Sequence, residues 1–176
     1  MAARQLRIIF HWVTFLLVTA SYTIAFYRTG LDDPDQRLFW LDCHRAIGLA
    51  VLALTLLRLA GRQVLPVESL HETTLLMRWI ARASHVLLYI GLVAMPLLGW
   101  AQSSAKMRSF KLFGVHMPAL LGHDPDFGDI LGEWHETLGW AILALIGLHS
   151  LAALYHHFVR RDRVLVDMLT AKTASS

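Results

Sequence analysis

The chain has 176 residues, enough for one ordinary domain, but 56% of them are hydrophobic and only 16% are charged. With a mean hydropathy of +0.49, this composition excludes an ordinary soluble globular domain. The net charge is +3, yet the basic side chains gather at the ends of apolar stretches, which indicates membrane topology and excludes a nucleic-acid partner.

Four apolar stretches are long enough to cross a bilayer as helices. They cover about residues 8–27, 41–60, 83–102 and 134–158. The sequence therefore predicts an all-α fold, a transmembrane four-helix bundle, built as a single integral-membrane domain over residues 1–176.

Basic side chains are distributed unevenly between the two sets of helix ends. Ten flank one set: Arg4, Arg7, Arg58, Arg62, Arg78, Arg82, Arg160, Arg161, Arg163 and Lys172. Six flank the opposite set, where carboxylates dilute them: Arg28, Arg37, Arg45, Lys106, Arg108 and Lys111. By the positive-inside rule, both termini and the loop over 61–82 are expected in the cytoplasm.

The connections between the stretches differ in character. Residues 32–35 predict a polar periplasmic turn, and the cytoplasmic connection contains Pro66 and an expected interfacial turn at 68–74. The connection over about 103–130 mixes cations with apolar residues. It is expected to lie in the membrane interface and cap that end of the bundle, the alternative being a plain linker. Residues after about 160 predict a short charged cytoplasmic tail.

Seven of the ten histidines lie in the apolar stretches, and two of these, His156 and His157, lie at the exit of the last stretch. His11 enters the first stretch from the cytoplasmic end, His44 opens the second from the periplasmic end, and His85 lies about one turn inside the third. On the fourth stretch, His135 lies near the periplasmic end and His149 lies toward the cytoplasm. Their fourteen-residue separation is about 21 Å along a helix and within about 40° around it, so one helix face presents imidazole at two depths.

Depth matching pairs His44 with His135 in a periplasmic layer and His11 with His149 in a cytoplasmic layer, where His85 rivals His11. Two imidazoles on facing helices can ligate a haem iron from both sides, and the absence of an open iron position suits electron transfer. A single cysteine excludes covalent c-type attachment, so any haem bound by these pairs is expected to be held non-covalently. A non-haem metal site, a proton path or incidental histidines are the alternatives.

Two glycines each follow one of these histidines by four residues. Gly48 follows His44 and Gly139 follows His135, so each lies one turn further along the same helix face. We expect these bare stretches of backbone to pack against the haem macrocycle. Close packing of two helices predicts the same glycines equally well.

Four short motifs follow one another in a fixed order: Ile9-Phe10-His11-Trp12, His44 with Gly48, Trp134-His135-Glu136-Thr137-Leu138, and Gly147-Leu148-His149. In their order and in the fourteen-residue step they resemble the bacterial cytochrome b561 family over nearly the whole chain. That family is related to the cytochrome b subunits of membrane hydrogenases and formate dehydrogenases. The resemblance implies four transmembrane helices, two haem b groups and quinone as a redox partner. It also implies His44 and His135 as ligands of one haem, and His11 and His149 as ligands of the other.

The same resemblance singles out His85 and His156. We expect these two imidazoles to bind the carbonyl oxygens of ubiquinone beside the cytoplasmic haem, the alternative being headgroup-level histidines without a ligand. The remaining histidines are expected at the headgroups or in loops: His71, His116, His123 and His157.

Some members of the family similar to this chain oxidise superoxide at the periplasmic face and pass the electron to ubiquinone. The resemblance therefore implies a bacterial inner-membrane dihaem cytochrome that carries electrons between a periplasmic donor and ubiquinone, as an enzyme a superoxide:ubiquinone oxidoreductase. The alternative is an anchor and electron-relay subunit of a larger dehydrogenase or hydrogenase, and a third class is a haem-free transporter or scaffold. Four cations could attract superoxide, although neighbouring acids favour an ordinary lipid-facing role: Arg45, Lys106, Arg108 and Lys111.

Overall fold

The computed structural model describes residues 2–64, 74–108, 111–112 and 115–170. Several features expected from the sequence lie outside these residues: Pro66, His71, Lys172 and the interfacial turn at 68–74 apart from Thr74. The membrane-spanning stretches and all the other histidines are described.

Four long helices dominate the described chain: α1 (Ala2–Thr29), α2 (Pro34–Val64), α3 (Leu75–Ala105) and α4 (Pro125–Tyr155). After α4 the chain continues as a short π-helix, η1 (His156–Arg160), and a last helix, α5 (Val164–Leu169). A small antiparallel hairpin between α3 and α4 joins β1 (Lys111–Leu112) to β2 (Val115–His116). The predicted all-α bundle is therefore confirmed.

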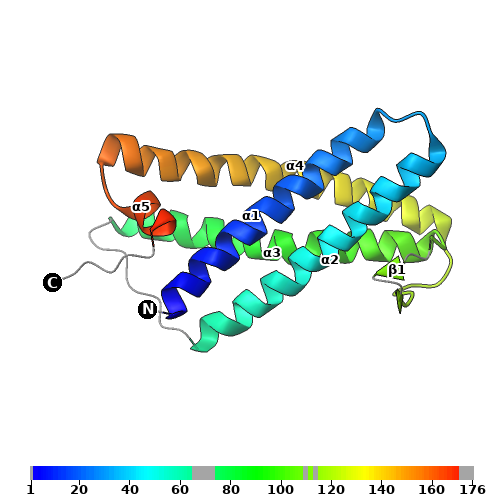
Figure 1. Cartoon of the computed structure of the whole chain (residues 1–176), viewed down its shortest axis with the longest axis horizontal. Coiled ribbons are helices and arrows are strands. Elements are labelled where there is room, and N and C mark those ends of the chain that lie inside the picture. The colour runs from blue at the N-terminus through cyan, green and yellow to red at the C-terminus, as the bar shows by residue number, and fades with distance from the viewer. Residues whose placement is uncertain (1, 65–73, 109–110, 113–114, 171–176) are drawn as a thin grey trace.

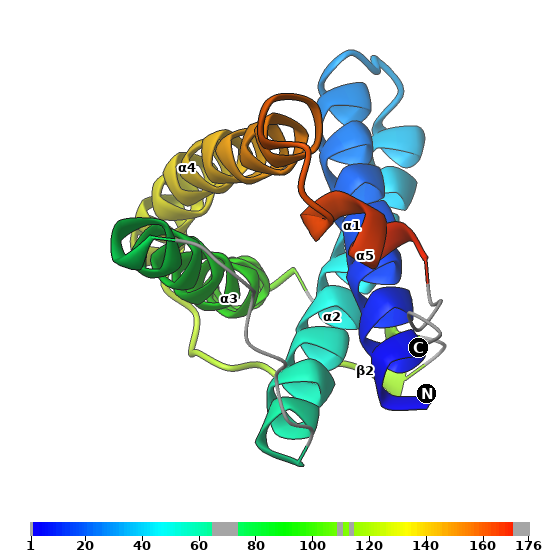
Figure 2. The same ribbon diagram turned by 90° about the vertical axis from the view of Figure 1, so that its left-hand side faces the viewer.

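The four helices form two antiparallel pairs. α1 packs along α2 and α3 packs along α4, while α2 also contacts α3 and so joins the pairs. Figure 1 shows the α1–α2 pair running obliquely across the α3–α4 pair, and Figure 2 shows the two pairs from the end that carries α5. The beginning of α1 and the helix α5 lie at the same end of the bundle, opposite the hairpin.

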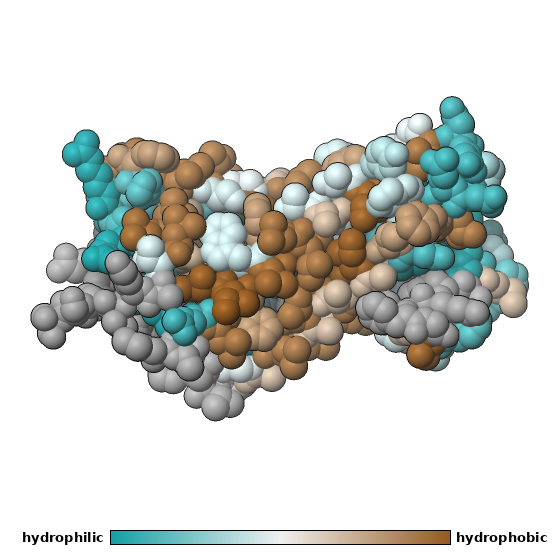
Figure 3. Space-filling model, in the orientation of Figure 1, coloured by the Kyte–Doolittle hydropathy of each residue, from teal (hydrophilic) through white to brown (hydrophobic). Residues whose placement is uncertain are grey.

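The outer surface of the bundle is apolar along the middle of the helices. Each of the four helices contains a segment long and apolar enough to cross a membrane. Large side chains on these segments point outward, with Leu16, Ile90 and Leu148 between 60% and 64% exposed. Figure 3 shows a mainly hydrophobic middle flanked by hydrophilic ends. Lipid tails, rather than a protein core, must cover such a surface.

Glycines let α3 and α4 approach closely. A Cβ atom on Gly91 would lie 2.7 Å from Cδ1 of Ile142 on α4, and one on Gly128 would lie 2.7 Å from Cγ of Lys106. Neither side chain could keep its place if the glycine carried a methyl group. Small residues at such crossings are typical of helix contacts in membranes.

Polar caps extend the helices beyond the apolar stretches. The Asp124 carboxylate accepts a hydrogen bond from the Phe127 N–H at 3.0 Å, and Pro125 occupies the first turn of α4. In the same way, the Asp33 carboxylate accepts from the Asp35 N–H at 2.9 Å at the start of α2. Hydropathy detects only the apolar part of each helix, so the predicted helices were too short.

The longer helices change the depth of several histidines. His44 lies ten residues after the start of α2, and His85 lies ten residues after the start of α3, which is about 15 Å in each case. The predictions that His44 opens its helix and that His85 lies one turn inside were therefore wrong. Likewise, residues 125–130 belong to α4 rather than to a connection, and the predicted tail contains the ordered helix α5.

Candidate functional site

Histidine rings from different helices meet at two depths of the bundle. On the side of the β1–β2 hairpin, the ring centroids of His44 on α2 and His135 on α4 are 6.2 Å apart; these two form the hairpin-side pair. On the side of the chain ends, His11 on α1 and His149 on α4 are 6.4 Å apart. His85 on α3 lies 5.3 Å from His149 and completes the terminus-side cluster of three rings. α4 supplies one histidine at each depth.

The two centroid separations test whether a haem iron fits between the rings. A metal–nitrogen bond of about 2.1 Å, with the nitrogen roughly 1.1 Å from the ring centre, places two trans imidazoles about 6.4 Å apart. The separations of 6.2 Å for His44–His135 and 6.4 Å for His11–His149 match this value. The 5.3 Å between His85 and His149 is about 1 Å too short. In length, both predicted pairs would leave room for one metal ion between their rings.

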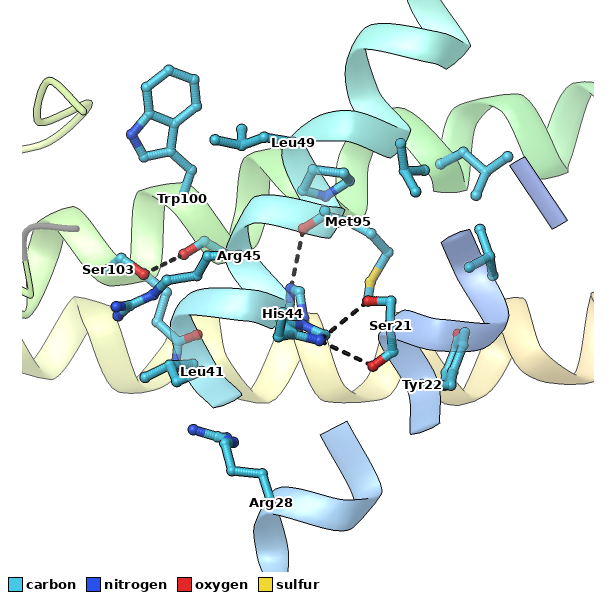
Figure 4. A pocket seen from close by; sticks show the side chains of 18 of the residues that line it. Ser21, Tyr22, Arg28, Leu41, His44, Arg45, Leu49, Met95, Trp100 and Ser103 are labelled. Atoms are coloured by element: carbon cyan, nitrogen blue, oxygen red, sulfur yellow. Dashed lines mark hydrogen bonds between the residues drawn. The ribbon is translucent and has the colours of Figure 1, made fainter. Parts of the chain in front are cut away.

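Backbone carbonyl groups fix the orientation of the hairpin-side pair. His44 Nδ1 lies 3.1 Å from the Ser21 carbonyl oxygen and 3.1 Å from Ser21 Oγ, as Figure 4 shows, and His135 Nδ1 lies 3.1 Å from the Met95 carbonyl oxygen. Because a carbonyl oxygen only accepts, both Nδ1 atoms must donate. Each Nε2 therefore keeps its lone pair, the arrangement usual for a metal-ligating histidine.

The glycines beside this pair play different parts. Gly48 lines the cavity next to the histidines, and a Cβ atom there would meet nothing within 4 Å. Gly139 lies outside that lining: its carbonyl oxygen accepts a hydrogen bond from Tyr22 Oη at 2.6 Å, and a Cβ atom would lie 3.5 Å from Met95 Cε. Gly99 on α3 makes room for His135, since a Cβ there would lie 3.1 Å from His135 Cε1.

A cavity of about 1120 Å³, measured out to its open mouth, surrounds the hairpin-side pair and is lined by all four long helices. Both histidines line it, as do apolar side chains such as Leu92 and Pro96. Pro96 lies inside α3, where it removes one backbone hydrogen bond of the helix. Apolar and polar side chains both line the cavity, as they do in sites for small molecules and cofactors.

Four cationic side chains also line this cavity: Arg28, Arg45, Lys106 and Arg108. Arg45 pairs with Asp42 at 2.8 Å, and Lys106 pairs with Asp129. The expectation that Arg45, Lys106 and Arg108 simply face lipid was therefore wrong, because the bundle turns them toward the cavity; the side chain of Lys111 lies outside the described part. Such cations would stabilise carboxylate groups at the edge of a bound cofactor, as haem propionates require.

The terminus-side cluster gathers three imidazoles from three helices. His11 and His149 are half-buried, whereas His85 is exposed at the side of the bundle. Within the described residues, no group of three or more His, Cys, Asp or Glu side chains is arranged to hold a metal ion by itself. The histidines are therefore grouped as one facing pair on the hairpin side and as three rings on the terminus side.

His156, the second expected quinone residue, has a different partner. Its Nδ1 bonds the Asp162 carboxylate at 2.5 Å, just beyond the end of α4. Partial burial raises the pKa of the Asp162 carboxyl, but the hydrogen bonds from His156 and the Val164 N–H, with the Arg160 charge, outweigh this and hold that pKa below its ordinary value. His123 lies in the loop before α4, as expected, whereas His116, which was expected in a loop, lies in strand β2.

Sequence reasoning missed the residues that position the paired histidines. Ser21 and Gly99 lie on α1 and α3 at the depth of the hairpin-side pair, and a hydroxyl or a glycine in an apolar helix at that depth is a usable signal. The Met95 carbonyl carried no signal, since every residue has one. The contribution of Arg28 was hidden because the sequence does not show which way a cation at a helix end points.

Comparisons with known proteins agree with this geometry. Residues 4–171 match a family described as prokaryotic cytochrome b561. The chain is 29% identical over 168 residues to a probable superoxide oxidase, CybB, from Yersinia pestis, covering 95% of each chain. It is 28% identical over 166 residues to cytochrome b561 homolog 2 of Escherichia coli K12, covering 91% of this chain and 87% of the relative. It is 27% identical over 169 residues to cytochrome b561 homolog 1 of the same organism, covering 93% and 94%.

The family match covers nearly the whole chain, and the bundle, the paired histidines and the lipid-facing surface are those of a haem-binding membrane protein of electron transfer. This chain is a bacterial membrane protein that belongs to the prokaryotic cytochrome b561 family.

Proposed function

We propose that this protein is a dihaem cytochrome of the bacterial inner membrane that carries electrons from a periplasmic donor, superoxide, to ubiquinone. One observation supports this most directly. The ring centroids of two histidine pairs are 6.2 Å and 6.4 Å apart, separations that would admit one haem iron between the members of each pair, and α4 contributes to both. Their α4 members are about 21 Å apart along the helix, so the pairs lie at opposite depths of the bilayer.

The hairpin-side pair would hold the first haem b. His44 and His135 would be its axial ligands, oriented by the carbonyl groups of Ser21 and Met95, while Gly48 would leave space at its face. Bound there, haem supplies an iron centre that takes up and releases one electron at a time. The chain's part is to present two neutral imidazoles and to neutralise the propionates with the cations of the cavity.

The terminus-side cluster would hold the second haem b between His11 and His149. The 6.4 Å separation and the partial burial of both rings support this pair over His85 with His149. His85 is exposed toward the lipid, from which ubiquinone would arrive, and His156 is the first residue of η1, just after the end of α4, the helix that carries His149. We assign His85 and His156 to hydrogen bonding and proton delivery at the quinone carbonyls.

The distribution of basic residues supports an orientation with both termini in the cytoplasm. Ten Lys and Arg residues lie at the ends near the termini and six at the opposite ends. The hairpin-side pair then faces the periplasm and the terminus-side cluster faces the cytoplasm.

The reaction balances as two one-electron oxidations and one two-electron reduction. Two superoxide anions each lose one electron and become dioxygen, while ubiquinone takes up the two electrons and two protons and becomes ubiquinol. The cavity cations support attraction of an anionic donor. The name of the Yersinia relative, a probable superoxide oxidase, agrees with this donor.

The test uses the purified full-length chain loaded with haem. We expect two haem b per chain in a pyridine haemochrome assay, and ubiquinone reduction when superoxide is generated. Replacing His135 or His149 with alanine should each remove one haem, whereas His116→Ala on β2 should remove none. A chain that binds two haems but does not reduce quinone with superoxide would be a relay subunit of a larger dehydrogenase. A chain without a Soret band would overturn the proposal.

A further inference from the structure

The end of the described chain folds back onto its beginning. Residues 156–170, which contain η1, a three-residue turn and α5, form what we name the C-terminal clamp. Trp12 Nε1 donates a hydrogen bond to the Met168 carbonyl oxygen at 2.8 Å, and Arg4 Nη2 pairs with Asp167 Oδ1 at 3.0 Å. These contacts join residues more than 150 positions apart at the terminus-side end of the bundle.

Hydrogen bonds to the residues before and after it hold the turn of the clamp, residues 161–163, in place. Arg161 adopts the left-handed conformation, with φ of 54°, and the Asp162 N–H donates to the His156 carbonyl oxygen at 3.2 Å. The Asp162 carboxylate bonds His156 Nδ1 at 2.5 Å and the Val164 N–H at 3.2 Å. One carboxylate therefore ties the end of α4 to the first residue of α5, and the clamp is anchored on α4.

Near its other end, the clamp contacts Trp12, the residue next to the proposed ligand His11. The ring of Trp12 lies edge-on to that of His11, with centroids 5.4 Å apart, and edge-on to Phe15 at 5.6 Å. The indole N–H points away from these rings to the Met168 carbonyl. Trp12 thus lies between the clamp and the imidazole of His11.

α1 is connected at two places to α4 or to the segment that follows it, and the C-terminal clamp makes one of these connections. Further along α1, Tyr22 Oη donates to the Gly139 carbonyl oxygen at 2.6 Å, and Phe26 lies against Trp140 with ring centroids 5.7 Å apart. His11 lies between this contact and the start of α1, which would otherwise fray as helix ends do. An axial ligand needs its position held to about 0.5 Å.

We propose that the C-terminal clamp sets the position of His11 relative to His149, with Trp12 as the positioning residue through which it acts. This inference rests on the proposed function, because it takes His11 and His149 as ligands of one haem. Trp12 does not touch the iron in this arrangement. It holds the imidazole next to it, and the clamp holds Trp12.

The experiment first assigns the two haems and then perturbs the clamp in the full-length, haem-loaded protein. His149→Ala and His135→Ala identify which low-spin electron paramagnetic resonance signal and which midpoint potential belong to each haem. Trp12→Phe then keeps an aromatic ring beside His11 but removes the N–H. Trp79→Phe is the matched control, because Trp79 lies near the same end of the bundle on α3 and is 63% exposed.

We expect Trp12→Phe to change the signal and the potential of the His11–His149 haem. It should also speed release of that haem to apomyoglobin by about 2- to 10-fold, the range for one neutral hydrogen bond. Asp167→Asn should act in the same direction, and Asp167→Glu should restore the original signal. The other haem should not change, and Trp79→Phe should change neither.

Two outcomes would overturn the inference. In one, Trp12→Phe leaves the His11–His149 haem as unchanged as Trp79→Phe does. In the other, both haems change equally, which indicates a general loss of stability. Failure of the proposed function looks different, because His149→Ala would then not remove one specific haem.

Discussion

At the scale of single residues, the chemistry of each histidine depends on the partner of its second ring nitrogen. His44 and His135 both donate from Nδ1 to backbone carbonyl groups, so their Nε2 atoms keep a lone pair. The Nδ1 of His156 is engaged by a carboxylate instead, which leaves its Nε2 for a ligand outside the helix. Neighbouring groups therefore hold residues of one type in different orientations, which suits the proposed division between haem ligands and proton carriers.

Gly99→Ala tests this orientation without touching a ligand. The new methyl group would lie 3.1 Å from His135 Cε1 and would push the ring away from the Met95 carbonyl. We expect the affinity of the His44–His135 haem to fall by about 10- to 100-fold, the usual effect of losing such a partner. Haem titration of the apoprotein measures it. Gly147→Ala on α4 meets nothing within 4 Å and should bind both haems normally; equal affinity in the two variants would contradict the prediction.

The histidine pairs could be predicted because helix geometry is nearly invariant. A fourteen-residue step on one unbroken helix fixes both a distance and a face, so matching His135 and His149 to partners needed only the depths of the other helices. Gly48 lines the cavity and Gly139 does not, and the packing of either glycine against haem stays a prediction. Sequence spacing identifies a face of one helix, but it does not show which neighbouring side chain, here Tyr22, takes the space.

At the scale of elements, polar residues at the helix ends shape the site as much as the apolar stretches do. Hydropathy located all four spans, but caps such as Asp124 add further turns in the polar region of the membrane. The helix α5 was missed because six residues bury too little surface to be recognised on their own. Its stability comes from contacts with residues near the other end of the sequence, such as Trp12.

The clamp should depend on pH through Asp162. Its pKa lies below the ordinary value of 3.8, so its charged form stabilises the folded clamp above that value, and this contribution is lost as the pH falls through the lower folded-state pKa. Asp162→Asn should therefore speed amide exchange in α5 at pH 7, and the difference from wild type should vanish under strong acid. Mass spectrometry of the α5 peptide measures it, with Asp126→Asn as a control. A difference that persists in acid would contradict the prediction.

At the scale of the whole molecule, an even number of spans returns the chain to the side on which it began. α1 starts and α5 ends at the same end of the bundle, so the basic residues near both termini share one membrane face (Figure 1). The opposite face carries the β1–β2 hairpin. An electron that passes from one histidine pair to the other therefore travels along the membrane normal.

The orientation is tested with fusions at the C-terminus. We expect a green fluorescent protein fused there to fluoresce, because it matures in the cytoplasm, and an alkaline phosphatase fusion to be inactive. The physical reason is the excess of Lys and Arg at the ends near the termini. The same reporters inserted between β2 and α4 should give the reverse result. An active phosphatase at the C-terminus would show that the cavity faces the cytoplasm.

α4 supplies one histidine at each depth, and this affects when haem can bind during synthesis of the protein. His11 leaves the ribosome 138 residues before His149, which at about 5–20 residues per second is roughly 7–28 s. If both haems are held as proposed, neither can acquire its second ligand before the last span is inserted. Haem loading then becomes a late, post-insertion event for both sites together, and a ribosome that stalls before α4 releases a product that holds no bis-histidine haem.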